Sequence, residues 1–269
     1  MTRLRRTFAS HAIAVDALDA AVELRRAPVG IKVIRSQAEF DAFDAPEPTA
    51  AAYYCAFVKL ASRGRRYKVA AHHFLCGAAA HHLGVTVVAD KGEHAEAYSG
   101  RGLYADAATA AVALAGVPTL WPGVVGVIVA PLASFSAEEA PDVALIVAPT
   151  YSAMRMTQGY AFHRPGGAEG RMLGMHGICG ESTAAPMLSG TLGVSLLCSG
   201  TRFMAKWDDD EVAVGLPAEQ FADLVDGVLE TLAPCEPDAK KAALMERAGE
   251  SLARCDVEIG MGEGYFYDV

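Results

Sequence analysis

The sequence predicts an α/β or α+β protein in which helices cover a mixed sheet. Short apolar runs rich in β-branched residues alternate with longer segments of helical periodicity. The clearest strands are the runs 124–130 and 143–148, because strands that are apolar throughout are typically buried on both faces. The clearest helix opens at Pro217, and its apolar residues recur at helical spacing between Phe221 and Leu232. A further helix over 237–254 completes a C-terminal amphipathic helix pair.

The other elements follow in chain order. We expect helices at 8–26, 50–62, 71–83, 104–115 and 150–161. We expect strands at 29–34, 67–70, 85–89, 194–197 and 212–214. The first helix ends before Pro28, since the residue before a proline disfavours helical backbone, and Gly84 ends the third as a C-terminal capping glycine. No long linker separates these elements, so a single domain over residues 1–269 is predicted.

Composition and charge restrict the class of protein. With 52% hydrophobic and 20% charged residues, the chain can bury a large core. The net charge of −9 does not favour a nucleic-acid partner, because phosphate binding calls for a basic face. No apolar stretch reaches the roughly 20 residues that a spanning helix needs, and no export signal is evident. We therefore expect a cytoplasmic protein without a membrane partner, and a homodimer as the commonest assembly.

Four of the six cysteines form two separated pairs. Twenty residues lie between Cys55 and Cys76, and 18 lie between Cys179 and Cys198. In a cytoplasmic chain of this length, metal binding, catalysis or burial explains cysteines better than disulfides do. A central sheet could bring the two pairs together, and four converging thiolates suit zinc or an iron–sulfur cluster. The chain has no Cys-x₂-Cys unit, so simple burial stays an alternative.

The residues around the second pair add to this hypothesis. Small residues flank Cys179 and follow Cys198, which allows backbone N–H groups to point at one anionic centre. Arg202 could lower a cysteine pKa or hold substrate charge. His176 lies three residues before Cys179 and could move a proton as a base. The alternative is a turn between strand and helix with a surface arginine.

Two further groups could bind metal. If 71–83 is one helix, His72 and His73 share a face with Cys76, which would allow a mixed Cys/His site. Partly exposed helical histidines are the alternative. The acidic run 208–211 could bind a divalent cation, but it also fits a solvated turn before a strand.

Several segments, taken in order, carry a resemblance to a known family. They are Pro28-Val29-Gly30-Ile31-Lys32, Tyr54-Cys55-Ala56-Phe57-Val58, Cys76-Gly77-Ala78-Ala79, Ala130-Pro131-Leu132, Pro141-Asp142-Val143, Ala153-Met154-Arg155, Cys179-Gly180-Glu181, Cys198-Ser199-Gly200-Thr201-Arg202 and Val214-Gly215-Leu216-Pro217. In these the chain resembles domain of unknown function 169, an uncharacterised family of bacteria and archaea. The resemblance covers about 20–235 and leaves a helical C-terminal extension.

The resemblance implies no settled activity, but it separates the cysteines. Cys55, Cys76, Cys179 and Cys198 match the family pattern, while Cys235 and Cys255 lie outside it. This chain departs from the pattern just before Arg155, where Tyr151-Ser152 replaces an expected glutamine. A role for Arg155 therefore does not carry over.

These observations leave three functional hypotheses. The first is an iron–sulfur protein with the four cysteines as ligands; if one is free, the open iron could act on a sulfur-containing substrate, with Arg202 and His176 as the catalytic candidates. The second is a structural zinc-binding or ligand-binding module without catalysis. The third is a metal-free enzyme with Cys198 or Cys179 as nucleophile. Whether the protein is an enzyme stays open, as does the choice between a small-molecule substrate and a redox partner.

Overall fold

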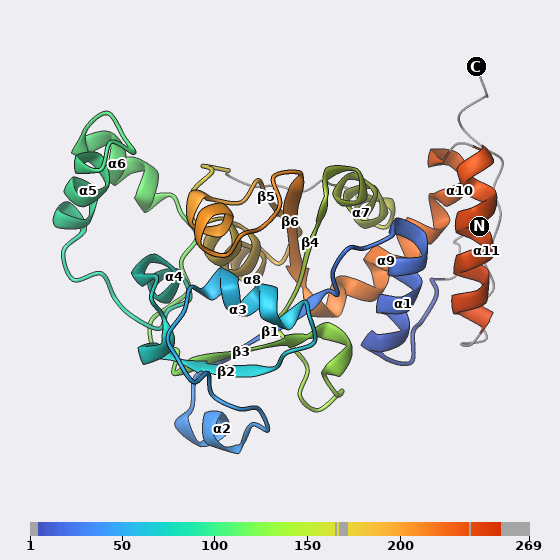
Figure 1. Ribbon diagram of the computed structural model, residues 1–269, viewed down its shortest axis with the longest axis horizontal. Helices are drawn as coiled ribbons and strands as arrows, with labels where there is room; N and C mark the ends of the chain where they lie inside the picture. Colours follow the sequence, from blue (N-terminus) through green and yellow to red (C-terminus); the bar gives the residue numbers. More distant parts are fainter. Residues whose placement is uncertain (1–4, 165, 167–171, 237, 254–269) are drawn as a thin grey trace.

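The fold is built on one six-stranded sheet (Figure 1). The computed structural model describes residues 5–253, except 165, 167–171 and 237. The strands are β1 Val29–Ile34, β2 Tyr67–Ala70, β3 Gly126–Pro131, β4 Val143–Pro149, β5 Gly193–Ser195 and β6 Glu211–Pro217. Their order across the sheet is β2-β3-β1-β4-β6-β5, and every pairing is antiparallel. The predicted class is confirmed, and the antiparallel pairings make it α+β.

Helices surround this sheet on both faces and at both ends. They are α1 His11–Val22, α2 Gln37–Ala42, α3 Tyr54–Ala61, α4 Gly77–His82, α5 Lys91–Gly100, α6 Ala107–Ala115, α7 Thr150–Phe162, α8 Ala185–Ser189, α9 Phe221–Glu230, α10 Leu232–Cys235 and α11 Asp238–Ala253. Two π-helices, Gly177–Ala184 and Gly200–Met204, lie in the second half of the chain. No helix in the described part of the chain is long and apolar enough to cross a membrane.

Successive side chains of β4 point to opposite faces of the sheet and contribute to a separate core on each face. Ala144, Ile146 and Ala148 point to one face, where α1, α7 and α9 pack. Val143, Leu145 and Val147 point to the other, where α3 and the first π-helix pack. Both sets are buried, as the continuous apolar sequence of this strand predicts. The second face also carries Cys55 and Cys179 in its core.

The α5–α6 hairpin lies at one end of the molecule, and α10 and α11 lie at the other (Figure 1). The hairpin has a small apolar core of its own, in which Ala95 and Tyr98 of α5 meet Ala110 of α6. Met175, on the segment before the first π-helix, packs against this core. The hairpin is therefore attached to the body close to the Cys179 segment.

Two predicted elements were wrong. Residues 85–89 form no strand: Gly84 turns the chain at a φ of +74°, and Val87 is exposed. The expected helix 71–83 is broken, because the chain is extended at Phe74 and Cys76 and α4 starts only at Gly77. His72 and His73 therefore do not share a helical face with Cys76.

Helices α7 and α9 cross with their backbones in contact. A Cβ built on Gly227 would overlap the backbone carbonyl of Gly159, and a Cβ on Gly159 would overlap the backbone of Val228. Backbone atoms cannot move aside as a flexible side chain can, so an added Cβ would force the two helices apart. This close crossing needs glycine on both helices.

We predict that Gly227→Ala lowers the free energy of unfolding by about 1–3 kcal/mol, because the added methyl group forces the two helices apart. Urea denaturation would measure the loss. Gly100→Ala is the matched control, since a Cβ there meets no atom within 4 Å, and we expect it to stay within about 0.5 kcal/mol of the parent. Equal stability of the two variants would contradict the tight crossing.

Candidate functional site

Four cysteines from four different segments line one cavity. Cys55, Cys76, Cys179 and Cys198 all border a cavity of about 220 Å³ on the second face of the sheet. Cys235 does not border it, and Cys255 lies outside the described residues. The structure thus places the four cysteines of the predicted set together and the fifth described cysteine elsewhere.

The first pair sits at the beginnings of two helices. Cys55 is the second residue of α3, and Cys76 is the N-cap residue of α4. The first N–H groups of a helix have no partner within the helix. The side chain of Cys76 makes no capping hydrogen bond to the N–H groups of α4. The broken helix that the sequence did not predict therefore places Cys76 at the N-terminus of a helix.

Cys179 is held by a π-helix that packs tightly on the sheet. A Cβ on Gly215 of β6 would overlap the carbonyl of Ser182, so glycine lets the π-helix approach this strand. Ser182 and Thr183 donate their hydroxyl groups to the carbonyls five residues earlier. The Tyr54 hydroxyl lies 3.2 Å from that of Thr183. Because Tyr54 precedes Cys55, this contact links the two buried cysteine segments.

Glu181 fixes the same π-helix from the opposite side. Its buried carboxylate accepts hydrogen bonds from Leu173 N at 2.7 Å and from the Ser195 hydroxyl at 2.5 Å. Glu181 is close in sequence to His176, but both of its carboxylate oxygens are engaged with these other groups and do not orient the imidazole. Its role in this structure is to join the π-helix to β5.

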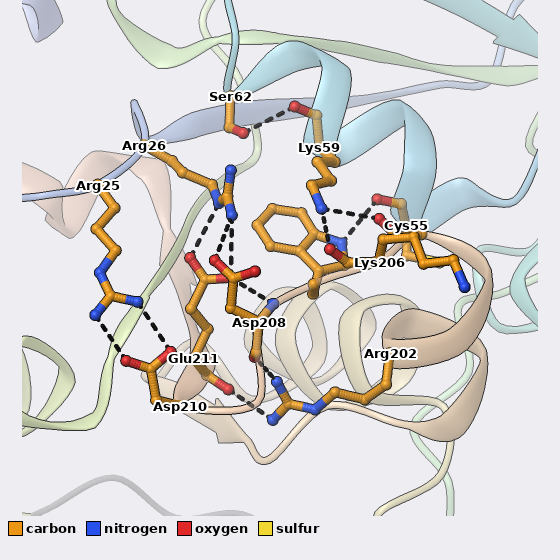
Figure 2. A network of polar contacts seen from close by, with 12 residues as sticks. Arg25, Arg26, Cys55, Lys59, Ser62, Arg202, Lys206, Asp208, Asp210 and Glu211 are labelled. Atoms are coloured by element: carbon orange, nitrogen blue, oxygen red, sulfur yellow. Dashed lines mark hydrogen bonds and ion pairs between the residues drawn. The ribbon is translucent and has the colours of Figure 1, made fainter.

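Cys198 follows β5 and lies beside helix α3. Trp207 donates its indole N–H to the carbonyl of Cys55 at 3.2 Å. Lys59 of α3 donates to the carbonyls of Ala205 and Lys206, and its ammonium lies 5.3 Å from the Trp207 ring (Figure 2). The segment that follows Cys198 is therefore tied directly to the helix that carries Cys55.

Arg202 stabilises the segment that follows Cys198 and does not border the cavity. It donates to the carbonyl groups of Leu196, Asp208 and Glu211, and it does not line the cavity (Figure 2). One planar guanidinium therefore closes the loop that contains Cys198. The sequence singled out this residue as a holder of substrate charge, whereas its observed contacts are structural.

Burial favours the protonated form of three of these thiols, those of Cys55, Cys76 and Cys179. Burial, with smaller contributions from neighbouring cysteines, raises the pKa of Cys55 to about 12. Burial likewise raises the pKa of Cys76 and, strongly, that of Cys179. The Thr201 hydroxyl lies 3.2 Å from the sulfur of Cys198, whereas Gly180 N–H donates to the carbonyl of His176.

The spacing of the sulfurs bears on the kind of metal. Among the described residues, only Glu47, His72 and His73 bring three potential ligand atoms within 4.8 Å of one another. No three of the four sulfurs are that close, whereas a tetrahedral zinc would hold its sulfurs about 3.8 Å apart. The cysteine set is thus wider than one zinc ion requires.

The compact Glu47 group is poorly prepared for a metal. Nδ1 of His73 accepts a hydrogen bond from Ala70 N at 3.2 Å, so in the neutral ring Nε2 carries the proton. Nε2 is the nitrogen that faces Glu47, at 3.9 Å. A metal bound there would displace that proton and reverse the tautomer that Ala70 selects.

His176 does line the cysteine cavity, and a second buried histidine lies behind it. The rings of His176 and His82 are 4.5 Å apart, and they are only 6% and 2% exposed. Nε2 has no hydrogen-bond partner among the described residues in either ring. Burial, with smaller contributions from neighbouring histidines, lowers the pKa of His176 to about 4 and that of His82 to about 3. Both rings are therefore neutral at pH 7.

Sequence reasoning missed the aromatic and cationic part of the cavity wall. Tyr53, Tyr98 and Arg101 border the cavity, the last two from the end of α5 and the residue after it. A lone arginine between Gly100 and Gly102 gives only a weak signal in the sequence. Its relevance depends on where the α5–α6 hairpin packs.

Two other candidates have structural partners. In the acidic run, Asp208 and Glu211 pair with Arg26, and Asp210 pairs with Arg25 (Figure 2). These ion pairs join the segment before β1 to the start of β6 and leave no evident cation site. Arg155 is fully buried and pairs with the buried Glu236 at 3.1 Å, away from the cavity.

The fold and the cavity define an α+β protein with four cysteines gathered on one face of its sheet. The DUF169 family, described as uncharacterised ArCR, matches residues 17–227. The chain therefore belongs to the DUF169 family, as the resemblance implied.

Comparison with individual proteins adds little to this assignment. A stretch of 88 residues is 26% identical to the uncharacterized protein MJ0308 of Methanocaldococcus jannaschii. That stretch is 33% of this chain and only 38% of the archaeal protein. No solved structure matches the chain.

We predict that stability falls as the pH is lowered from about 6.5 towards 3. The pKa values of His82 and His176 are depressed in the folded state, so the unfolded chain binds protons at higher pH than the folded chain does, and this binding lowers the free energy of the unfolded state. Each histidine contributes at most about 1.4 kcal/mol per pH unit over this range. Urea denaturation between pH 7 and 4 would measure the slope.

The matched variants for this measurement are His82→Asn and His72→Asn. Asparagine at position 82 keeps a donor for the Thr119 hydroxyl, which lies 2.8 Å from His82 Nδ1, but cannot be protonated. We expect His82→Asn to reduce the slope of the free energy of unfolding against pH, whereas His72→Asn, at an exposed position, should leave that slope unchanged. An unchanged slope in His82→Asn would contradict the buried neutral histidine.

We predict that Arg202→Gln lowers the free energy of unfolding by about 1–3 kcal/mol, because carbonyls of the Cys198 loop lose their donors. Arg202→Lys should restore only part of the loss, since an ammonium cannot reproduce the planar guanidinium. Thermal or urea unfolding would measure both, with Arg63→Gln at an exposed position as control. If Arg202→Gln were as stable as the control, Arg202 would not stabilise the Cys198 loop.

Proposed function

We propose that this protein binds an iron–sulfur cluster through Cys55, Cys76, Cys179 and Cys198 and uses it in redox or sulfur chemistry. The observation that carries the proposal is that four cysteines far apart in sequence line one cavity. Simple burial of hydrophobic cysteines would not require them to share a cavity. Four thiolates are the usual ligand set of such clusters.

The groups beside the sulfurs support this proposal. The hydroxyl of Thr201 lies 3.2 Å from the sulfur of Cys198, and Cys76 lies at the N-terminus of α4. Donors of this kind stabilise thiolate ligands and tune the potential of a bound cluster. No Asp or Glu borders the cavity, so the donor set is dominated by sulfur. Sulfur-rich sites favour iron–sulfur clusters or zinc over magnesium or calcium.

The width of the site favours a cluster over a single zinc ion. No three of the sulfurs lie within 4.8 Å of one another, and a multinuclear cluster spans a wider set of ligands than one ion does. The cavity of about 220 Å³ between them leaves space for more than one atom. A structural zinc site would require the four segments to move closer together.

The metal-free nucleophile is the less favoured alternative. A nucleophilic cysteine needs a low pKa and a base. Burial raises the pKa of Cys179 well above its ordinary value, and neutral His176 has no carboxylate to orient it. Cys198 has Thr201 and not a base as its hydrogen-bond partner.

In a protein that holds the cluster, different segments of the chain would have different roles. Cys55 and Cys179 hold it from buried elements fixed to the sheet, while Cys76 and Cys198 hold it from half-buried helix starts. The cluster would supply one-electron transfer or, with one cysteine free, a Lewis-acidic iron. His176, neutral and buried beside the cavity, would exclude water and offer one nitrogen to a bound molecule.

The cellular setting follows from this chemistry. Thiolate clusters are best maintained in a reducing compartment, so we keep the cytoplasm as the predicted location. A small-molecule substrate or a redox partner would then exchange electrons at the cavity. The homodimer stays a prediction from the frequency of such assemblies, since all the residues that line the cavity come from one chain.

We predict that protein purified without oxygen is brown, with broad absorbance near about 400 nm and near-equal amounts of iron and acid-labile sulfide. Single Cys→Ser changes at positions 55, 76, 179 and 198 should each reduce iron content or change the spectrum. Cys235→Ser is the matched control, because Cys235 lies away from the cavity, and it should retain the parent spectrum. Spectroscopy and metal analysis would measure all five variants.

The alternatives give different results in the same experiment. Colourless protein with one equivalent of zinc, lost in the cysteine variants, would support the zinc module. Protein without metal under anaerobic conditions would refute both metal proposals. Alkylation of one cysteine that blocks activity without unfolding the chain would then support the nucleophile.

A further inference from the structure

The lining of the cysteine cavity combines two kinds of chemistry. Sulfur comes from four segments packed on the sheet, whereas oxygen and nitrogen donors come from Tyr53, Ser199 and the end of the α5–α6 hairpin. The hairpin contributes Tyr98 and, next to the last residue of α5, Arg101. The proposed cluster uses the sulfur atoms and gives no function to these oxygen- and nitrogen-bearing side chains.

The polar side-chain groups of these residues make no hydrogen bond or ion pair with the described part of the chain. Arg101 forms no hydrogen bond or ion pair there, and its guanidinium lies 5.8 Å from the ring centre of Tyr98. The hydroxyl groups of Tyr53, Tyr98 and Ser199 likewise have no hydrogen-bond partner there. Nε2 of His176 is a further unpaired polar atom at this cavity, in a side chain that is 6% exposed. All of these residues border the same cavity.

The charge of the lining selects the ligand. Arg101 is the one arginine or lysine at the cavity, and no Asp or Glu borders it. Arg101 is exposed, and its guanidinium is free to pair with an oxyanion at the mouth of this largely apolar cavity, because the planar fork matches the oxygens of such a group. Neighbouring hydroxyl groups can donate to the same oxygens.

We propose that the cavity binds a small organic oxyanion, whose carboxylate, sulfonate or phosphate group meets Arg101 while its other end faces the cysteines. This assignment extends the proposed function: the oxyanion site depends on Arg101 and the hydroxyl groups near it, whereas what the other end meets rests on the proposed cluster. The volume of about 220 Å³ restricts the ligand to a small molecule. A sulfur-containing acid fits both kinds of lining.

Three matched probes separate the two halves of this proposal: propionate, 3-mercaptopropionate and 3-mercapto-1-propanol. Binding to the full chain, prepared without oxygen, would be measured by isothermal titration calorimetry. The absorption spectrum of the bound chromophore would be followed in parallel. We expect both acids to bind and the alcohol to bind at least about 10-fold more weakly, since it lacks the charge-assisted bonds to Arg101.

The variants are Arg101→Gln, Arg101→Lys and Arg63→Gln. We expect Arg101→Gln to weaken both acids about 10-fold or more without altering iron content, Arg101→Lys to retain part of the affinity, and the exposed Arg63→Gln to match the parent. Sulfonate and phosphate analogues of propionate would then identify the preferred headgroup. Acids that do not bind the parent, or that bind Arg101→Gln equally well, would overturn the oxyanion site.

The proposed cluster can fail independently. If the chain holds no iron but propionate still binds in an Arg101-dependent manner, the oxyanion site stands and the cluster does not. If iron and sulfide are present but the acids do not bind, the cluster stands and the oxyanion site is wrong. A spectral change with 3-mercaptopropionate but not with propionate would place the thiol end at the cluster.

Discussion

The packing of the π-helix Gly177–Ala184 against β5 and β6 is the constraint on which the cavity depends. A π-helix is wider than an α-helix and leaves its carbonyls less well satisfied, so it persists only where its surroundings favour it. Here Gly215 lets the backbone of Ser182 touch the strand, and side-chain hydroxyls of the helix cap its own carbonyls. Any side chain at position 215 would move Cys179 away from the sheet and thus from Cys55.

A second constraint acts through charge. Arg26 pairs with the fully buried Glu211, and Lys59 donates to carbonyls beside Trp207. Burial lowers the pKa of Lys59, which shows that holding it there opposes its charged form. Buried ionic groups contribute little net stability compared with well-packed apolar residues. Their value here is positional, since they determine how the Cys198 segment lies against the helix of Cys55.

Much of the fold could be predicted from local pattern. The strands 29–34 and 67–70 and the helix from Phe221 were visible because periodicity and β-branching report burial directly. The break at Phe74 was not visible, since 71–83 has the composition of a helix. The isolated bridge of Phe74 to Ala52 and the hydrogen bonds of Ala52 with His73 and Leu75 hold that segment extended. Tertiary contact therefore overrode local propensity at the point where Cys76 becomes a helix cap.

The cysteine set was recognisable because its members match a family pattern, while the roles of single residues were not. Arg202 follows a cysteine and resembles a site residue in sequence, but its partners are carbonyls that only the folded loop brings near. Arg101 has no such signal, since its place depends on a hairpin that packs through Tyr98 and Met175. Sequence proximity indicates which residues share a loop, not which face a cavity.

The division of the cavity wall between rigid and peripheral elements has a chemical consequence. The four cysteines come from segments fixed to the body of the fold by hydrogen bonds and glycine contacts, which would suit the proposed cluster. The polar groups of Tyr98 and Arg101 come from the α5–α6 hairpin, which has a small separate core. Such an element can shift with less loss of burial than the body can. If the proposed oxyanion binds at Arg101, the hairpin can therefore adjust to it while the four cysteines keep their places in the cavity wall.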